Sequence, residues 1–142
     1  MVGFLQIRFS VDKIETINGC PAATQDITIN IANRQTAIDK ANYGPMLPNL
    51  PSSKFWKQKA NIFHIPVEEA KKARCGNCAA FIQTPEIMSC ITKGLGDEKG
   101  SYSPIVIKTA NLGFCEIFDF KCAGDRTCDA WVTGGPILAR TK

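Results

Sequence analysis

The sequence predicts a small α+β protein that is helix-leaning and irregular, with an N-terminal strand and a second half organised by a metal centre. Three observations predict this class. Residues near the start alternate between apolar and polar types, as a half-buried strand does. Two later segments repeat apolar residues at helical spacing, and six of the seven cysteines lie in the second half of the 142-residue chain. A chain of this length can form one domain with one hydrophobic core.

The composition argues against several function classes. Hydrophobic residues make up 44% of the chain, as in an ordinary globular protein, and the formal net charge is +4. This mild basic bias comes without a basic stripe interleaved with aromatic residues, so we expect no direct nucleic-acid binding. No apolar run approaches the roughly 18 residues that span a bilayer, and the first residues lack a small-residue cleavage site. We therefore expect neither a membrane span nor a signal peptide.

An N-terminal arm, residues 1–18, carries the clearest strand pattern. In FLQIRFSV (residues 4–11), four apolar side chains face one way and polar side chains face the other. A strand must pair with another to satisfy its backbone groups, and the clear candidate elsewhere is a short strand at residues 105–108 (IVIK). The arm is either a hairpin edge within the domain or a strand that docks on another protein or a second copy. Residues 19–142 are predicted to form a single cysteine-rich domain.

Helices are predicted between the arm and the first cysteine pair. Apolar residues at helical spacing indicate a helix over residues 24–43, which Gly44 and Pro45 end. Residues 44–53 contain three prolines and are expected to be extended, either as a linker or, as their apolar residues favour, draped over the core. Ser52 or Ser53 caps a second helix, and Pro66 begins a third that leads directly to Cys75. A glycine-rich, charged loop is predicted over residues 92–104.

The cysteines predict a metal centre. Cys75 and Cys78 form a C-x2-C pair whose intervening Gly76 and Asn77 allow a tight turn, so both sulfurs can reach one metal or cluster. Basic residues before the pair favour the thiolate form, which binds metal. Four more cysteines follow downstream, and without an export signal metal ligation is favoured over disulfides. They are Cys90, Cys115, Cys122 and Cys128.

An iron–sulfur cluster is favoured over zinc on chemical grounds. Zinc needs four ligands, often from two C-x2-C pairs, and the chain has one such pair. Its single histidine, His64, is interpreted as a packed or solvated helix-end residue. Iron–sulfur clusters accept looser cysteine spacing in an apolar, aromatic shell. Aromatic residues close to the cysteines in sequence are Phe81, Phe114, Phe118, Phe120 and Trp131. Zinc remains the alternative.

The cysteine motif resembles that of the high-potential iron–sulfur proteins. The resemblance rests on RCGNCAAF, a following cysteine and then GFC. It implies a 4Fe–4S cluster held by four ligands, which are Cys75, Cys78, Cys90 and Cys115. Cys122 and Cys128 lie outside that pattern and are possible metal ligands, or partners in a disulfide with each other. One of them could also replace Cys90 as a ligand.

A wider resemblance covers residues 19–131. The segments around GCPAATQDITINIANRQ, VEEAKKARCGNCAAF and GFCEIFDFKCAGDRTCDAW are similar to small proteins of tailed bacteriophages, whose family is often labelled iron–sulfur-like. The resemblance implies a virion component, assembled in the host cytoplasm. It also implies that the N-terminal arm is a docking addition, through which the chain would contact other virion proteins or itself.

Three functions compete on these observations. The first is a structural protein of a phage virion, in which the cluster stabilises a small domain. The second is a soluble electron-transfer protein of the high-potential type, and the third is a structural zinc module. We expect no enzyme activity, because no Ser-His-Asp set or phosphate-binding glycine loop is present. Charged residues after Cys115 are interpreted as solvated loop charges: Asp119, Lys121, Asp125, Arg126 and Asp129.

Overall fold

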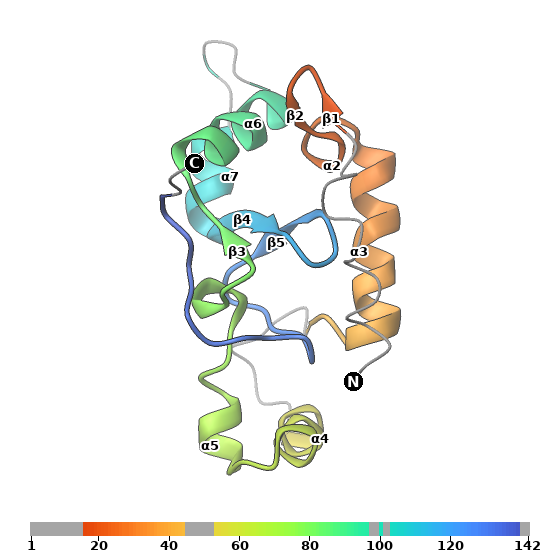
Figure 1. Ribbon diagram of the computed structural model, residues 1–142, viewed down its shortest axis with the longest axis vertical. Coiled ribbons are helices and arrows are strands. Elements are labelled where there is room, and N and C mark those ends of the chain that lie inside the picture. Colours follow the sequence, from red (N-terminus) through yellow and green to blue (C-terminus); the bar gives the residue numbers. More distant parts are fainter. Residues whose placement is uncertain (1–15, 45–52, 97–99, 101–102, 140–142) are drawn as a thin grey trace.

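The computed structural model describes residues 16–44, 53–96, 100 and 103–139. Figure 1 shows a small three-stranded sheet at the centre, with α3 (Ile27–Ala41) along one side of it. The helices α6 (Pro85–Leu95) and α7 (Ser103–Ala110) lie at one end, and α4 (Ser53–Phe63) and α5 (Val67–Ala70) lie at the other. The predicted small α+β class is confirmed. The strand predicted at residues 4–11 lies outside the described residues.

The helix predicted over residues 24–43 is present as two helices. A two-stranded hairpin, β1 (Thr16–Ile17) and β2 (Cys20–Pro21), leads into α2 (Ala22–Gln25). Asp26 then adopts an extended conformation and caps α3, because its carboxylate accepts hydrogen bonds from the amides of Thr28 and Ile29. Asn42, with a φ of 54°, ends α3 in the left-handed conformation.

The helix after Ser53 is confirmed, whereas the next is shorter than predicted. Helix α4 begins at Ser53, and its Trp56 and Ala60 pack against Ala70 of α5. Pro66 immediately precedes α5, which ends after one turn at Ala70 instead of continuing through residue 74. The chain then runs through a short 3₁₀ turn, η3 (Cys75–Asn77), into the central sheet.

The central sheet is antiparallel, in the order β3 (Phe81–Ile82), β4 (Leu112–Cys115), β5 (Phe120–Ala123). Strands β4 and β5 form a hairpin in which Cys115 pairs with Phe120, and β3 pairs with the other edge of β4 through Phe81 and Cys115. The strands are two to four residues long. Such a sheet cannot supply a large core alone and depends on what packs against it.

The short strand predicted at residues 105–108 is wrong, because those residues lie in α7. Pro104 occupies the first turn of this helix, where a proline is tolerated because its missing N–H has no helical partner. Ile105 and Val106 are 62% and 43% exposed, so their β-branched side chains are not buried against a sheet. The predicted loop at 92–104 is also partly helical, since α6 continues to Leu95.

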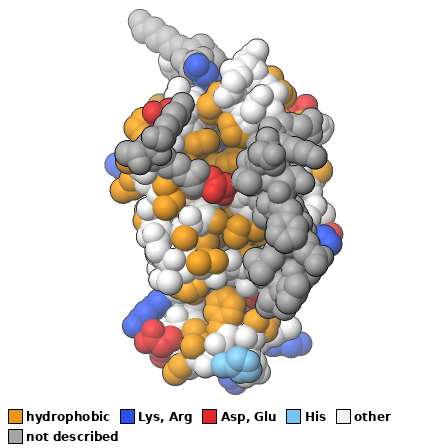
Figure 2. All heavy atoms as spheres, in the orientation of Figure 1, with side chains coloured by type: hydrophobic (Ala, Val, Ile, Leu, Met, Phe, Trp, Pro, Cys, Tyr) orange, Lys and Arg blue, Asp and Glu red, His pale blue; other side chains and the backbone are white. Residues whose placement is uncertain are grey.

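The largest buried cluster joins α3 to the sheet and to the segment that follows β5. In Figure 2, hydrophobic side chains occupy much of the middle of the face in view, and charged side chains gather at the end that carries α4 and α5. No helix in the described portion of the chain is long and apolar enough to cross a membrane.

Candidate metal centre

Five free cysteines from separate segments meet in the largest core cluster. Four of them are at most 8% exposed, and the fifth, Cys115, is partly buried and packs against them. Two come from η3 and the residue directly after it, two from the β4–β5 hairpin and one from the following loop. In chain order they are Cys75, Cys78, Cys115, Cys122 and Cys128. The structure therefore brings together five of the six cysteines that the sequence singled out.

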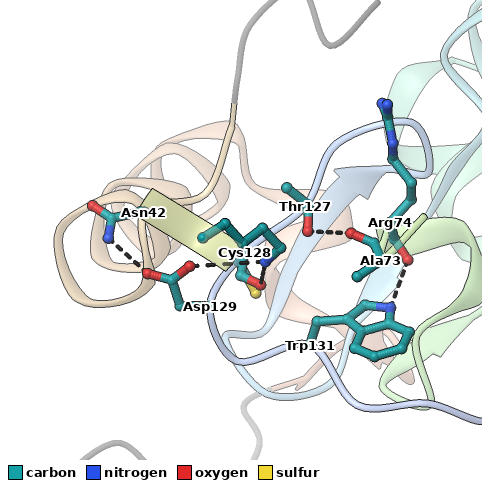
Figure 3. Close-up of polar contacts among 8 residues, drawn as sticks. Asn42, Ala73, Arg74, Thr127, Cys128, Asp129 and Trp131 are labelled. Atoms are coloured by element: carbon teal, nitrogen blue, oxygen red, sulfur yellow. Dashed lines mark hydrogen bonds and ion pairs between the residues drawn. The ribbon is translucent and has the colours of Figure 1, made fainter. Parts of the chain in front are cut away.

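Backbone hydrogen bonds hold the C-x2-C turn against the loop after β5. The amide of Cys75 donates to the Arg126 carbonyl at 2.6 Å, and the amide of Cys78 donates to the Cys75 carbonyl at 2.9 Å. The indole of Trp131 donates to the Arg74 carbonyl at 3.0 Å, as Figure 3 shows. The same indole also donates to Asn77 Oδ1 at 2.8 Å. These bonds fix the position of Cys75 and Cys78 relative to Cys128.

Backbone amides surround the cysteine sulfurs, and two of them donate hydrogen bonds to Cys78. Cys78 Sγ accepts from Ala80 N at 3.4 Å and also from Val132 N at 3.5 Å. The amides of residues 117 and 118 act to lower the pKa of Cys115, and the amide of residue 130 acts to lower that of Cys128. Amide donors stabilise a thiolate, and hydrogen bonds to ligand sulfurs are a feature by which proteins tune iron–sulfur clusters.

Burial opposes these amide donors. It raises the pKa of Cys78 and, more strongly, that of Cys128, with further increases from neighbouring cysteines. A thiol that is costly to ionise in the metal-free core binds metal with release of its proton, so metal binding and ionisation are coupled there.

Cys122 differs from the other four. Burial raises the pKa of Cys122 well above its usual value, and its hydrogen bonds with Cys115 and Cys75 raise it further. The bond with Cys122 is the largest cause that lowers the pKa of Cys115. The protonated form is therefore favoured more strongly at Cys122 than at Cys115.

Aromatic residues surround the cysteines, largely as predicted. Phe81, Phe118 and Phe120 lie in the same core cluster, and Trp131 packs against it. Phe114 instead belongs to a second cluster with Ala23 and Ile82. Tyr43 is a core member that the sequence analysis missed; its ring meets Phe120 edge-on at 4.9 Å and its hydroxyl accepts the amide of Ala123. Burial raises the pKa of Tyr43.

Lys59 is the other residue that the sequence analysis missed. It is 1% exposed, and burial lowers its pKa, while Asp129 and nearby cysteines act in the opposite direction. The sequence did contain a signal for a buried lysine, because Lys59 lies on the same helical face of α4 as the apolar residues Trp56, Ala60 and Phe63. Its partner Asp129 has a side chain only 9% exposed, so the interpretation of Asp129 as a solvated loop charge is wrong.

Cys90 does not join the other predicted ligands. It forms a disulfide with Cys20, with the two Cα atoms 5.6 Å apart, and this bond ties α6 to β2. Cys122 and Cys128 are both free, so the disulfide considered between them is not formed in this structure. The disulfide partner of Cys90 is thus the one cysteine that lies far from the rest in sequence.

The donor set suits a metal that prefers thiolates. Among the described residues, no group of three or more His, Cys, Asp or Glu side chains is already arranged to hold a metal ion. Five thiols in one core nevertheless provide the soft sulfur ligands that iron–sulfur clusters and zinc select. Comparison of the chain with known protein families, curated proteins and solved structures finds no match.

Proposed function

We propose that this protein binds a 4Fe–4S cluster through Cys75, Cys78, Cys115 and Cys128, and that the cluster is the structural centre of the domain. The observation that carries the proposal is the convergence of five free cysteines from separate segments in one buried cluster. The amide donors to Cys78, the amides that lower the pKa of Cys115 and Cys128, and the aromatic side chains in the same cluster support a cluster of this kind.

The ligand set differs at one position from the set expected by resemblance. Cys128 replaces Cys90, because Cys90 is bonded to Cys20 and Cys128 lies with the C-x2-C pair. Cys122 is left as a thiol beside these ligands, where its single S–H can donate to one neighbouring sulfur. Outer-shell donors of this type orient ligands and tune the metal.

When bound, the cluster supplies iron–sulfur bonds that tie the η3 turn, β4 and the loop after β5 to one point. The chain supplies the thiolates, amide donors and a water-excluding aromatic wall. A structural role is supported by the small size of the sheet, since strands of two to four residues give a thin core. A role in the virion of a tailed phage, with other virion proteins or a second copy as partners, rests on the resemblance.

The test of the proposal is the metal content of protein purified without oxygen. We expect about four irons and four sulfides per chain and a broad brown absorption band. A colourless protein with one zinc per chain and no iron would contradict the cluster and support the zinc module. Reversible reduction of an otherwise monomeric protein would favour electron transfer, whereas its presence in purified phage particles would favour the structural role.

Single substitutions test the ligand assignment. Cys75→Ser, Cys78→Ser and Cys128→Ser should each abolish iron retention, because each leaves one iron without its thiolate. Cys122→Ala should keep most of the iron and serves as the matched control, since it removes an equally buried sulfur from the same core. Full iron content in Cys128→Ser, or its loss in Cys122→Ala, would show that Cys122 is the fourth ligand.

A further inference from the structure

Lys59 places a positive charge inside the core, in contact with the backbone of Cys128. Helix α4 carries it on the face that also holds Trp56 and Ala60, and its side chain is 1% exposed. Its electrostatic neighbours include three of the free cysteines, which are Cys128, Cys75 and Cys78. A lysine is almost never fully buried unless a negative group compensates it.

The partners of Lys59 in the structure compensate this charge only in part. Nζ donates a short hydrogen bond, 2.6 Å, to the Cys128 carbonyl, which is neutral. Nζ also lies 4.3 Å from the centre of the Phe63 ring. The carboxylate of Asp129 is 3.8 Å away, longer than the roughly 2.7–2.9 Å of a charge-assisted hydrogen bond. The other oxygen of Asp129 accepts from Asn42 at 2.7 Å, as Figure 3 shows.

A cluster held by four thiolates requires a positive charge nearby. It carries a net negative charge, and a buried anion is stable only when cations or dipoles compensate it. Among the described residues, Lys59 is the fully buried cation; it contacts Cys128, and its charge also acts on Cys75 and Cys78. Charges interact strongly at this depth because the surroundings screen them less than water does.

We infer that Lys59 is the internal counter-charge of the metal centre and that it raises the reduction potential of the cluster. The inference rests on the proposed function. One-electron reduction adds a negative charge to the cluster, so a nearby buried cation stabilises the reduced form more than the oxidised form. Asp129 acts in the opposite sense, because it is a nearly buried anion on the residue next to Cys128.

The test is a redox titration of the purified holoprotein with dithionite and ferricyanide, followed by absorption. Lys59→Met should shift the potential to more negative values, because it keeps the apolar stem and removes the charge. Asp129→Asn, which is nearly the same shape, should shift the potential to more positive values. Lys71→Met is the matched control, because it removes the same charge from a side chain that is 44% exposed and screened by solvent. The control should leave the potential unchanged.

The opposite directions of the two potential shifts distinguish this inference from an ion pair that only stabilises the fold. If Lys59 and Asp129 only stabilise the fold, both variants should unfold at lower temperature while their clusters keep the wild-type potential, and the inference is then wrong. If Lys59→Met does not fold, the sign of the Asp129→Asn shift decides, and an unchanged or lowered potential overturns the inference. A wild-type protein without iron would instead defeat the proposed function, and that result is visible before any variant is made.

Discussion

Gly135 lies so close to the C-x2-C turn that a side chain at this position meets backbone. Its amide donates to the Asn77 carbonyl at 3.1 Å, and a Cβ built on it would overlap the carbonyl oxygen of Cys78. Gly135→Ala should therefore displace Cys78 and destabilise the protein by about 1–3 kcal/mol, the usual effect of overpacking.

Thermal unfolding and iron content check this prediction together. Val132→Ala is the control, because Val132 belongs to the same segment, is 48% exposed and keeps its backbone bond to the Cys78 sulfur. The control should change stability by less than about 0.5 kcal/mol. Equal stability of Gly135→Ala and the wild type would show that the C-terminal segment can move away from the turn.

At the scale of the element, α3 depends on one exposed N-cap. The hydroxyl of Thr28, and then its amide, hold the pKa of Asp26 below its usual value. A carboxyl whose pKa is lowered by folding stabilises the protein at pH values above its unfolded pKa, and that contribution is lost as the pH falls through the folded pKa. Acidification should therefore weaken this cap.

Asp26→Asn isolates the charge in this cap, since asparagine is also a good N-cap. We expect wild type to be more stable than the variant at neutral pH, and the difference in thermal midpoint to shrink as the solution is acidified through the pKa of Asp26. The measurement is thermal unfolding followed by helical circular dichroism at several pH values. A difference that is constant with pH would mean that the carboxylate charge contributes nothing to α3.

The whole molecule is closed by the Cys20–Cys90 disulfide, which spans 70 residues. A crosslink of that span restricts the unfolded chain, so the double variant Cys20→Ala/Cys90→Ala should lose about 4 kcal/mol of unfolding free energy. Urea unfolding measures the loss. The iron content of this variant should equal that of wild type, because the disulfide lies apart from the proposed ligands. Loss of iron on removing Cys90 would restore it as a ligand.

Local signals in the sequence were sufficient for several elements. A serine cap and apolar residues at helical spacing predicted α4. Gly44 and Pro45 predicted that the helix before them ends at residue 43, and α3 ends two residues earlier, at Ala41. The C-x2-C pair predicted a tight turn, which η3 provides. These features depend on contacts between residues that are close in the sequence, so the sequence alone is sufficient to predict them.

Tertiary packing decided the rest. Residues 105–108 have strand-like side chains, but Pro104 in a first helical turn and the lack of burial left them in α7. The pairing of Cys90 depends on how α6 packs on α2, where Gly94 lies directly against the carbonyl of Thr24. The spacing of residues along the sequence could not predict this contact, because the two helices lie about 70 positions apart in the chain.

The sequence by itself therefore determined that this is a small α+β protein with a thiol-rich second half. Only the tertiary structure decided which cysteines meet, because Cys128 reaches Cys75 and Cys78 through the loop after β5, and Cys90 is turned toward Cys20. It also decided that Lys59 lies beside them, because an apolar helix face carries its side chain into the core regardless of its charge.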